Sequence, residues 1–230
     1  ATPVRDPAAD YLGVNLGLGR TVTTYLMTGL LAVSLYFQFR AKRYVPGIYW
    51  LSVVLISIVG TLITDNLVDN LGVPLIATTV LFAAALAVTF GVWYASEHTL
   101  SIHTIVTTTP EAFYWLAILF TFALGTAAGD LLAEGLNLGY LASGLLFAGL
   151  IGLVALGYYK FHMNEVLAFW MAYILTRPLG ASVGDFLSQA RADGGLGLGT
   201  TVTSVLFLSA IAAVVIYLSS THTDEEIAIE

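Results

Sequence analysis

Hydrophobic positions along the chain fall into seven long runs separated by short polar segments. The runs lie near 21–39, 47–67, 75–95, 112–132, 140–159, 165–188 and 201–219. About 20 helical residues cross the roughly 30 Å hydrocarbon layer of a bilayer, so each run is long enough to span it. The alternation of polar and apolar residues that marks membrane β-barrels is missing from these runs. The pattern predicts an all-α fold, a polytopic transmembrane helix bundle of about seven helices in a single membrane domain, 1–230.

Composition agrees with a chain whose surface faces lipid. Hydrophobic residues make up 58% of the chain and charged residues 10%, and the mean hydropathy is +0.87. The lipid bilayer is therefore the first expected partner. Part of the net charge of −7 lies in an acidic tail, 221–230, so the charge indicates nothing about nucleic acid, and none is expected as a partner. The chain has no cysteine, which excludes disulfides, thiolate metal sites and thiol catalysis.

Three helical segments repeat one another without a gap. They read "YWLSVVLISIVGTLITDNLVD" from Tyr49, "YWLAILFTFALGTAAGDLLAE" from Tyr114 and "FWMAYILTRPLGASVGDFLSQ" from Phe169. Each copy carries a tryptophan, a glycine ten residues later and an aspartate five residues after that: Trp50, Gly60 and Asp65; Trp115, Gly125 and Asp130; Trp170, Gly180 and Asp185. We call these the leading helices.

A second block follows each leading helix and predicts a trailing helix. It begins at Asn70, Gly135 and Gly195, and a fourth copy, "NLGLGRTVTTYLM", begins at Asn15 and follows Asp10. The chain is therefore predicted to hold four two-helix repeats, approximately 1–40, 45–96, 110–160 and 165–220. The first is incomplete, because most of its leading helix would lie upstream of Ala1, and Arg5-Asp6 stands where other copies have glycine and a small residue. We expect that the chain is truncated or processed or has lost this helix, and that a complete copy has eight helices.

The repeated acids predict a polar stripe on each leading helix. If the tryptophans mark one membrane interface, the glycines lie about 15 Å and the aspartates about 22 Å along the helix. Residues four apart share a helix face, which aligns Thr61, Asp65 and Asp69, then Thr126, Asp130 and Glu134, then Ala181, Asp185 and Gln189. A charge at this depth costs roughly 2.5 to 3.5 kcal/mol or more, so the stripes are expected to face the bundle interior or a water-filled cavity.

Two interpretations of these residues are open. In the first, cation or proton binding is carried by the stripe residues Asp65, Asp130, Asp185, Asp69, Glu134, Thr61 and Thr126. In the second, each aspartate caps a helix or meets water at the interface. Arg177, followed by Pro178, is expected to balance the charge of Asp185 or Asp130, or to form a structural ion pair. Which metal, if any, is bound is open, and no cofactor is expected.

Two further features carry weaker predictions. His98 and His103 lie in the longest polar connection and could bind a metal or sense protons, although ordinary loop polarity explains them too. Arg40, Lys42, Arg43 and Lys160 lie on the tryptophan side of the helices and Arg5, Arg20 and Arg191 on the other. The positive-inside rule therefore predicts that the tryptophan side is cytoplasmic.

The repeats, together with "RYVPGIYW" and "TLSIHTIVTT", resemble a bacterial integral membrane protein family built from tandem two-helix repeats of unknown function, with one tryptophan per repeat. The resemblance implies a complete version with four repeats and eight helices, and no established activity. We expect the protein to lie in a bacterial-type cytoplasmic (inner) membrane. No nucleophile motif, phosphate-binding loop or dinucleotide fingerprint is present, so an enzyme is not expected. The residues favour a small transporter or channel-like protein for a hard cation or protons, and a homo-oligomer is compatible with them. The alternative is a non-catalytic structural or accessory membrane subunit.

Overall fold

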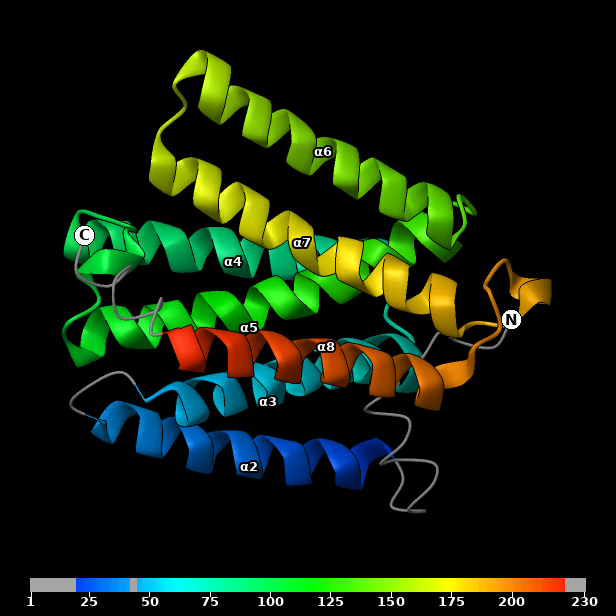
Figure 1. Ribbon diagram of the computed structural model, residues 1–230, viewed down its shortest axis with the longest axis horizontal. Helices are drawn as coiled ribbons and strands as arrows, with labels where there is room; N and C mark the ends of the chain where they lie inside the picture. Colours follow the sequence, from blue (N-terminus) through cyan, green and yellow to red (C-terminus); the bar gives the residue numbers. More distant parts are fainter. Residues whose placement is uncertain (1–19, 42–44, 222–230) are drawn as a thin grey trace.

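A computed structural model of the protein describes residues 20–41 and 45–221, which form seven α-helices and, within those ranges, no strand. The helices are α2 (Arg20–Arg40), α3 (Pro46–Asp65), α4 (Leu75–Glu97), α5 (Thr108–Asp130), α6 (Tyr140–Phe161), α7 (Glu165–Ser188) and α8 (Gly199–Thr221) (Figure 1). The predicted all-α bundle of seven helices is confirmed. Arg5, Asp6, Asp10, Lys42, Arg43 and residues 222–230 of the acidic tail lie outside the described residues.

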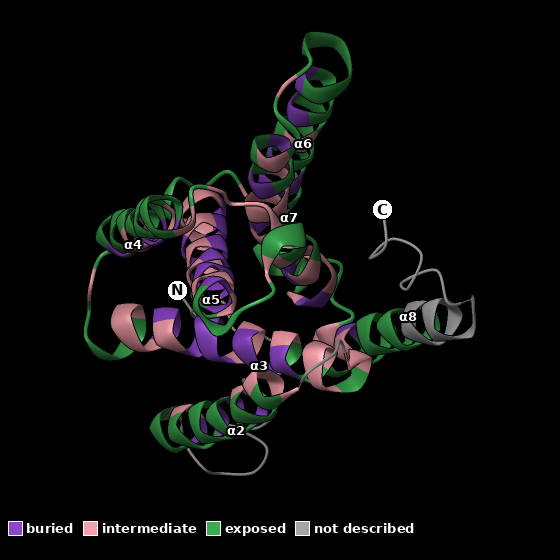
Figure 2. Ribbon diagram, turned by 90° about the vertical axis from the view of Figure 1, so that its left-hand side faces the viewer, coloured by how far each residue is buried: buried purple, intermediate pink, exposed green. Residues whose placement is uncertain are grey.

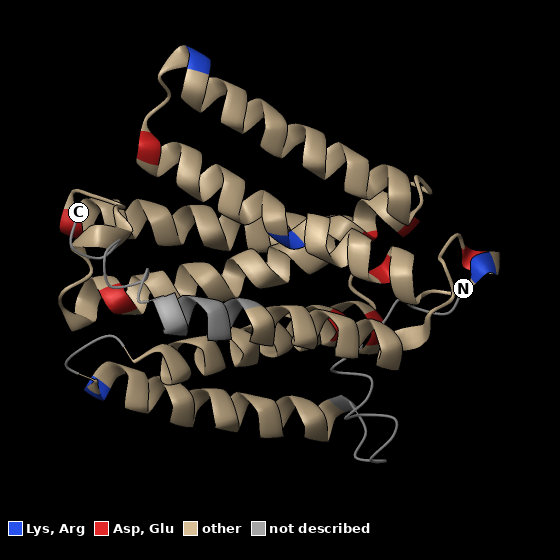
Figure 3. Cartoon of the chain, viewed as in Figure 1, with Lys and Arg blue, Asp and Glu red and all other residues tan. Residues whose placement is uncertain are grey.

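The helices have the dimensions of membrane spans. Six of them, α2 to α7, are long and apolar enough to cross a membrane, and the described apolar part of α8, Gly199–Ala213, is shorter. Acidic and basic residues gather toward the helix ends, and α7 alone shows a basic band at its middle, which is Arg177 (Figure 3). Because apolar side chains cover the long sides of the helices, the chain is a membrane protein.

Two leading helices end in a wider turn. After α3 and α5 the chain continues as π-helix, over Asn66–Asn70 and Leu131–Gly135. The amide of Leu71 donates to the carbonyl of Asn66 at 3.1 Å, and that of Leu136 to Leu131 at 2.8 Å. A π-turn closes its hydrogen bonds over five residues instead of four, so it rotates the residues that follow it away from the face that an α-helix would give them.

Two histidines lie at the C-terminal ends of helices. His98 ends α4 and His162 ends α6, each in the left-handed conformation with φ of 56° and 52°. The amide of His98 donates to the carbonyl of Tyr94 at 2.8 Å. His103 lies in a short 3-10 helix, Ile102–Thr104. His98 therefore has a structural role at the end of α4.

The leading helices α3, α5 and α7 lie side by side, with α5 between the other two, and the trailing helices lie around them (Figure 2). Each trailing helix packs chiefly against the leading helix of the next repeat: α2 against α3, α4 against α5 and α6 against α7. Buried apolar side chains from both helices of a pair form these contacts, as Met27 and Leu31 of α2 do with Leu55 and Ile56 of α3. The hydrophobic core thus runs between repeats.

Glycine brings neighbouring leading helices into close contact. A Cβ added to Gly60 would lie 2.9 Å from the Cβ of Phe122 on α5. One added to Gly125 would meet the Cβ of Arg177 and lie 3.2 Å from the nitrogen of Pro178 on α7. Phe122 and Arg177 occupy the same repeat position, so α3 meets α5 and α5 meets α7 in the same register. Only glycine permits backbones to approach this closely.

Candidate functional site

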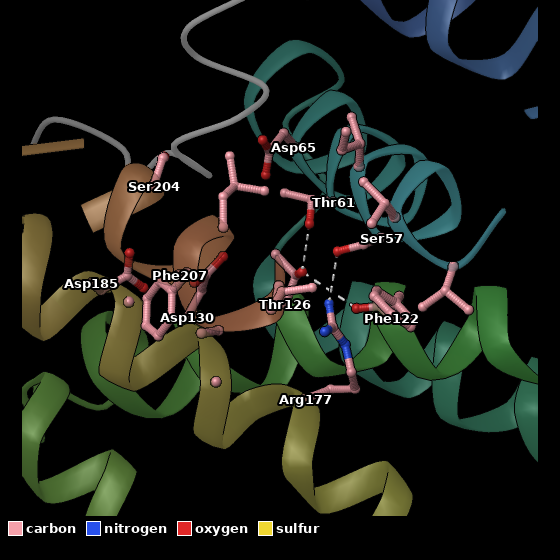
Figure 4. A pocket seen from close by; sticks show the side chains of 18 of the residues that line it. Ser57, Thr61, Asp65, Phe122, Thr126, Asp130, Arg177, Asp185, Ser204 and Phe207 are labelled. Carbon is pink, nitrogen blue, oxygen red and sulfur yellow. Dashed lines mark hydrogen bonds between the residues drawn. The ribbon is translucent and has the colours of Figure 1, made fainter. Parts of the chain in front are cut away.

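The three repeated aspartates lie in one pocket. This cavity of about 430 Å³ lies between α3, α5, α7 and α8, and its lining includes Asp65, Asp130 and Asp185 (Figure 4). We call it the acidic pocket. Its acids are 65 and 55 positions apart in the sequence, and each comes from a different repeat. The structure thus brings together the three residues on which the sequence prediction rested.

Their convergence follows from helix register and helix contact. Asp65 and Asp130 are the last residues of α3 and α5, and Asp185 lies in the last turn of α7. Because the glycine contacts hold the three helices in equal register, the aspartates reach the same end of the bundle. Asp65 and Asp185 are buried and Asp130 is partly buried. Such acids are costly among transmembrane helices, which makes this end of the pocket a candidate functional site.

A chain of hydroxyl hydrogen bonds lies next to the acids. The Oγ1 atoms of Thr61 and Thr126 are 3.2 Å apart, and the hydroxyl of Thr126 donates to the carbonyl of Phe122 at 3.3 Å. A threonine hydroxyl has one proton to donate. When Thr126 donates this proton to Phe122, Thr61 is the donor to Thr126. Both predicted threonines line the acidic pocket, one turn before Asp65 and Asp130.

Arg177 forms the basic end of the pocket. Its Nη2 donates to the Oγ of Ser57 on α3 at 3.1 Å, and its guanidinium carbon lies 3.2 Å from the centre of the Phe122 ring. Arg177 precedes Asp185 by eight residues on α7, about 12 Å along the helix axis. The pocket therefore carries positive charge near the middle of α7 and acidic groups toward one end. These contacts join three leading helices through one side chain.

The remaining two predicted acids lie elsewhere. Asp69 and Glu134, both described, are outside the lining of the acidic pocket. Asp69 is exposed, and Oε1 of Glu134 accepts a hydrogen bond from the hydroxyl of Tyr140 at 3.2 Å. The prediction that Asp69 and Glu134 share a face with the aspartates assumed a continuous α-helix. Both residues instead lie in a π-helix. The extra residue in that turn rotates them off the stripe.

The acids share the pocket without forming a metal cluster. Within residues 20–41 and 45–221, no three His, Cys, Asp or Glu side chains form a group that could hold a metal ion. Direct coordination by several carboxylates requires oxygen atoms about 2.3 to 2.6 Å from a calcium ion, for example. The arrangement fits groups that exchange protons or contact a hydrated cation through water.

Sequence reasoning missed part of the lining. Ser57 contributes the acceptor for Arg177, and α8 contributes Ser204, Phe207, Leu208 and Ile211. One signal was present: Ser57, Phe122 and Arg177 occupy equivalent repeat positions, and all three line the pocket. Nothing in the sequence places α8 beside α3, because a membrane helix does not reveal its neighbours through its apolar pattern.

The four repeats are also recognised by comparison with known families. Residues 7–44, 48–99, 113–164 and 168–224 match the family described as Repeat of Unknown Function (DUF347). The chain belongs to this family. The match covers most of the chain and confirms the resemblance to a family of tandem repeats. No curated protein and no solved structure matches the chain.

The DUF347 matches divide the acidic pocket between repeats. The second, third and fourth matches contain Asp65, Asp130 and Asp185, and each supplies the leading helix that carries its aspartate. The described part of the first match contains α2, which lies outside the pocket lining. Three DUF347 repeats thus supply one acid each to a common site.

Proposed function

We propose that the protein conducts protons or small hydrated cations across its membrane, with Asp65, Asp130 and Asp185 as the groups that bind and release them. One observation carries this proposal: three acids from three repeats line a single pocket of about 430 Å³ among transmembrane helices. Intramembrane acids of this kind are rare and commonly mark ion pathways and proton relays. Sites at the interface of membrane repeats are also a common construction in transporters.

The other polar groups have defined roles in this proposal. Thr61 and Thr126 supply hydroxyl oxygen atoms beside the acids and are hydrogen-bonded to each other. Arg177 adds a positive charge at the other end of the pocket, where it sets the charge balance and repels a cation that has passed the acids. Among the residues that the structure describes, no group of carboxylates is close enough to hold a metal ion directly, which favours hydrated ions or protons over a dehydrated, multiply coordinated ion.

The proposal includes a location and a class of activity. The protein would lie in a bacterial cytoplasmic membrane, with the tryptophan end of α3, α5 and α7 in the cytoplasm. The acids would then open toward the outer face. Its activity would be transport or conduction without chemical conversion of a substrate, so we propose that it is not an enzyme.

Flux through purified protein in liposomes tests the proposal. A pH-sensitive dye inside the vesicles reports proton entry driven by a potassium gradient and valinomycin, and sodium or potassium flux is followed separately. Wild-type vesicles should acidify or take up cations faster than empty ones. The triple variant Asp65→Asn, Asp130→Asn and Asp185→Asn should return flux to that of empty vesicles.

The matched control removes charge outside the pocket. Asp193→Asn, in the 3-10 helix Arg191–Asp193, changes the net charge without touching the lining. It should keep wild-type flux. Both variants must elute from size-exclusion chromatography and unfold on heating as the wild type does. A loss of flux can then be assigned to the acidic pocket and not to misfolding. A folded triple variant with unchanged flux would contradict the proposal.

A structural or accessory role is the second candidate, and a specific observation favours it. Arg177 contacts Ser57 and Phe122, so one polar side chain ties α7 to α3 and α5. Under this proposal the polar groups serve packing or assembly. Asp130→Asn would then weaken folding or assembly and leave vesicle flux at the level of empty liposomes for both proteins.

A further inference from the structure

The acidic pocket has the outline of a groove along the leading helices. Its lining on α3 extends from Trp50 to Asp65, about 22 Å along the helix, at positions three and four residues apart. On α7 and α8 it follows the same spacing, through Gly180 and Gly184 on α7 and Phe207 and Ile211 on α8. Residues at this spacing form one helix face. These three helix faces surround the groove along their length, together with Phe122, Thr126 and Asp130 of α5.

The α7 face of the groove repeats a surface that elsewhere contacts a helix. Gly60 of α3 and Gly125 of α5 are each covered by the next leading helix. Gly180 is the equivalent residue of α7, and a Cβ added there would meet nothing within 4 Å. The same register that joins α3 to α5 and α5 to α7 thus ends at Gly180, facing the groove.

The α8 face is likewise uncovered where the equivalent faces of the other trailing helices are covered. Met27, Phe82 and Phe147 are equivalent residues of the trailing helices α2, α4 and α6, with exposed fractions of 6%, 5% and 5%. Each lies in a helix that packs against the next leading helix. Phe207 is their equivalent on α8, is 36% exposed and lines the groove. The face of α8 that should meet a leading helix is the one that lines this groove.

The α3 face supplies the third observation. Trp115 packs on Tyr49 and Trp170 on Tyr114, with ring centres 5.5 and 6.3 Å apart, so each tryptophan meets the preceding leading helix. Trp50, the equivalent on α3, lines the groove and is only partly buried. Each of the three faces therefore repeats an interface that is filled by a leading helix at the other repeats.

We infer that the groove between α3, α7 and α8 is the binding site of a fourth leading-type transmembrane helix, the one that precedes α2 in repeat order. Its glycine would face Ser57 of α3, and its residue three positions earlier would face Gly180 of α7. The four leading helices then close into a ring around the acids. This inference rests on packing and stands whether or not the protein conducts ions.

The connection to α2 has the right geometry. Asn66 at the end of α3 donates from Nδ2 to Oγ1 of Thr24 at 2.9 Å, which places the start of α2 near the acid end of the groove. In the second and third repeats the trailing helix begins five residues after the leading segment ends, at Leu75 after Asn70 and at Tyr140 after Gly135. A leading helix with an equally short connection would reach α2 from this end.

Docking requires a movement of α8. An α-helix with its side chains is about 10 to 12 Å across. The groove extends along the helices, and a volume of about 430 Å³ makes it too narrow to hold such a helix. The main helix partner of α8 is α7, whereas α3 and α5 are each packed between several helices. α8 would move outward and pack on the fourth helix, as α2, α4 and α6 pack on theirs.

Disulfide cross-linking tests this in the full 230-residue chain, which contains no cysteine of its own. The probe is a synthetic peptide with the sequence of residues 111–134, which covers α5 from its second turn onward and most of the π-helix after it, with Thr126→Cys. It is reconstituted into liposomes with protein carrying Ala181→Cys. The hydroxyls of Thr61 and Thr126 are 3.2 Å apart at the equivalent contact, so the two sulfur atoms should come within bonding distance.

The expected result is a one-to-one adduct, formed several-fold more at Ala181→Cys than at the control site Gly149→Cys. Gly149 is exposed on α6, with nothing within 4 Å of an added Cβ. A peptide that also carries Gly125→Leu should lose the adduct, since its side chain blocks close approach to Ser57. Equal adducts at both sites, no adduct, or disulfide-linked dimers of the protein in preference to peptide would each overturn the inference. Ion flux is not part of the readout, so failure of the proposed function leaves this test intact.

Discussion

Arg177 on α7 and Ser57 on α3 are joined by a 3.1 Å hydrogen bond that passes beside α5, the helix between them. The two residues occupy the same position in their repeats, and so does Phe122, on whose ring the guanidinium lies. One repeat position thus holds serine, phenylalanine and arginine, and these three side chains meet. The contact makes the acidic pocket asymmetric although its helices are related by repetition.

Removal of the arginine should destabilise the bundle. Arg177→Leu removes a hydrogen bond to a charged donor, worth about 1.5 to 3 kcal/mol, and a cation–π contact worth about 0.5 to 2 kcal/mol. Ser57→Ala should cost less because the contact of Arg177 with the Phe122 ring remains. SDS titration in mixed micelles measures the unfolding free energy of each single variant and of the double variant. These values give the coupling free energy between Arg177 and Ser57. A coupling near zero would show that this hydrogen bond contributes nothing to stability.

Alanine substitution at two glycines in equivalent repeat positions should change the unfolding free energy by different amounts. Gly60→Ala places a Cβ 2.9 Å from the Cβ of Phe122, so the unfolding free energy should fall by about 1 to 3 kcal/mol. Gly180→Ala meets nothing within 4 Å, so stability should hold or rise by up to about 1 kcal/mol through helix propensity. Thermal unfolding of the two variants measures the contrast. Equal losses at both positions would disagree with the open face of α7.

The threonine pair should show a directional effect. Thr126→Val leaves the buried Thr61 hydroxyl proton without its acceptor, at a cost of about 1 to 3 kcal/mol. Thr61→Val should cost less, because Thr126 still donates to Phe122. The double variant should be no less stable than Thr126→Val alone. The reverse order of the two single variants would show that the donor order is the opposite one.

Substitution of acids that line the pocket should reduce flux, whereas substitution of acids outside it should not. Asp69→Asn and Glu134→Gln lie beyond the lining, so vesicle flux should stay near wild type. Glu134→Gln should lower the melting temperature slightly, since the Tyr140 hydroxyl loses a charged acceptor. Asp65→Asn and Asp185→Asn should reduce flux, because both acids line the pocket. If Asp69→Asn abolished flux in a folded protein, the pathway would have to extend past the π-turn.

The extent of sequence prediction is clearest at the stripe residues. Thr61, Asp65, Thr126, Asp130, Asp185 and Arg177 were predicted as one site, and all of them line the acidic pocket. Asp69 and Glu134 were predicted by the same four-residue spacing and lie outside it. The spacing rule holds only where the backbone stays α-helical, and the change to π-helix at Asn66 and Leu131 depends on local hydrogen bonds that the residue types do not specify.

The amino-acid sequence by itself determined the membrane helices, the tandem repeat and the register of tryptophan, glycine and aspartate, because apolar length and repetition are properties of the chain alone. Only the tertiary structure decided which helices meet. Gly60 and Gly180 occupy equivalent positions in their repeats, yet one is in close contact with α5 and the other faces a groove. Phe147 and Phe207 differ in the same way. The physical reason is that lipid and protein are both apolar, so hydrophobicity places a side chain in the membrane, and only the packed neighbour shows whether it faces a helix, a pocket or lipid.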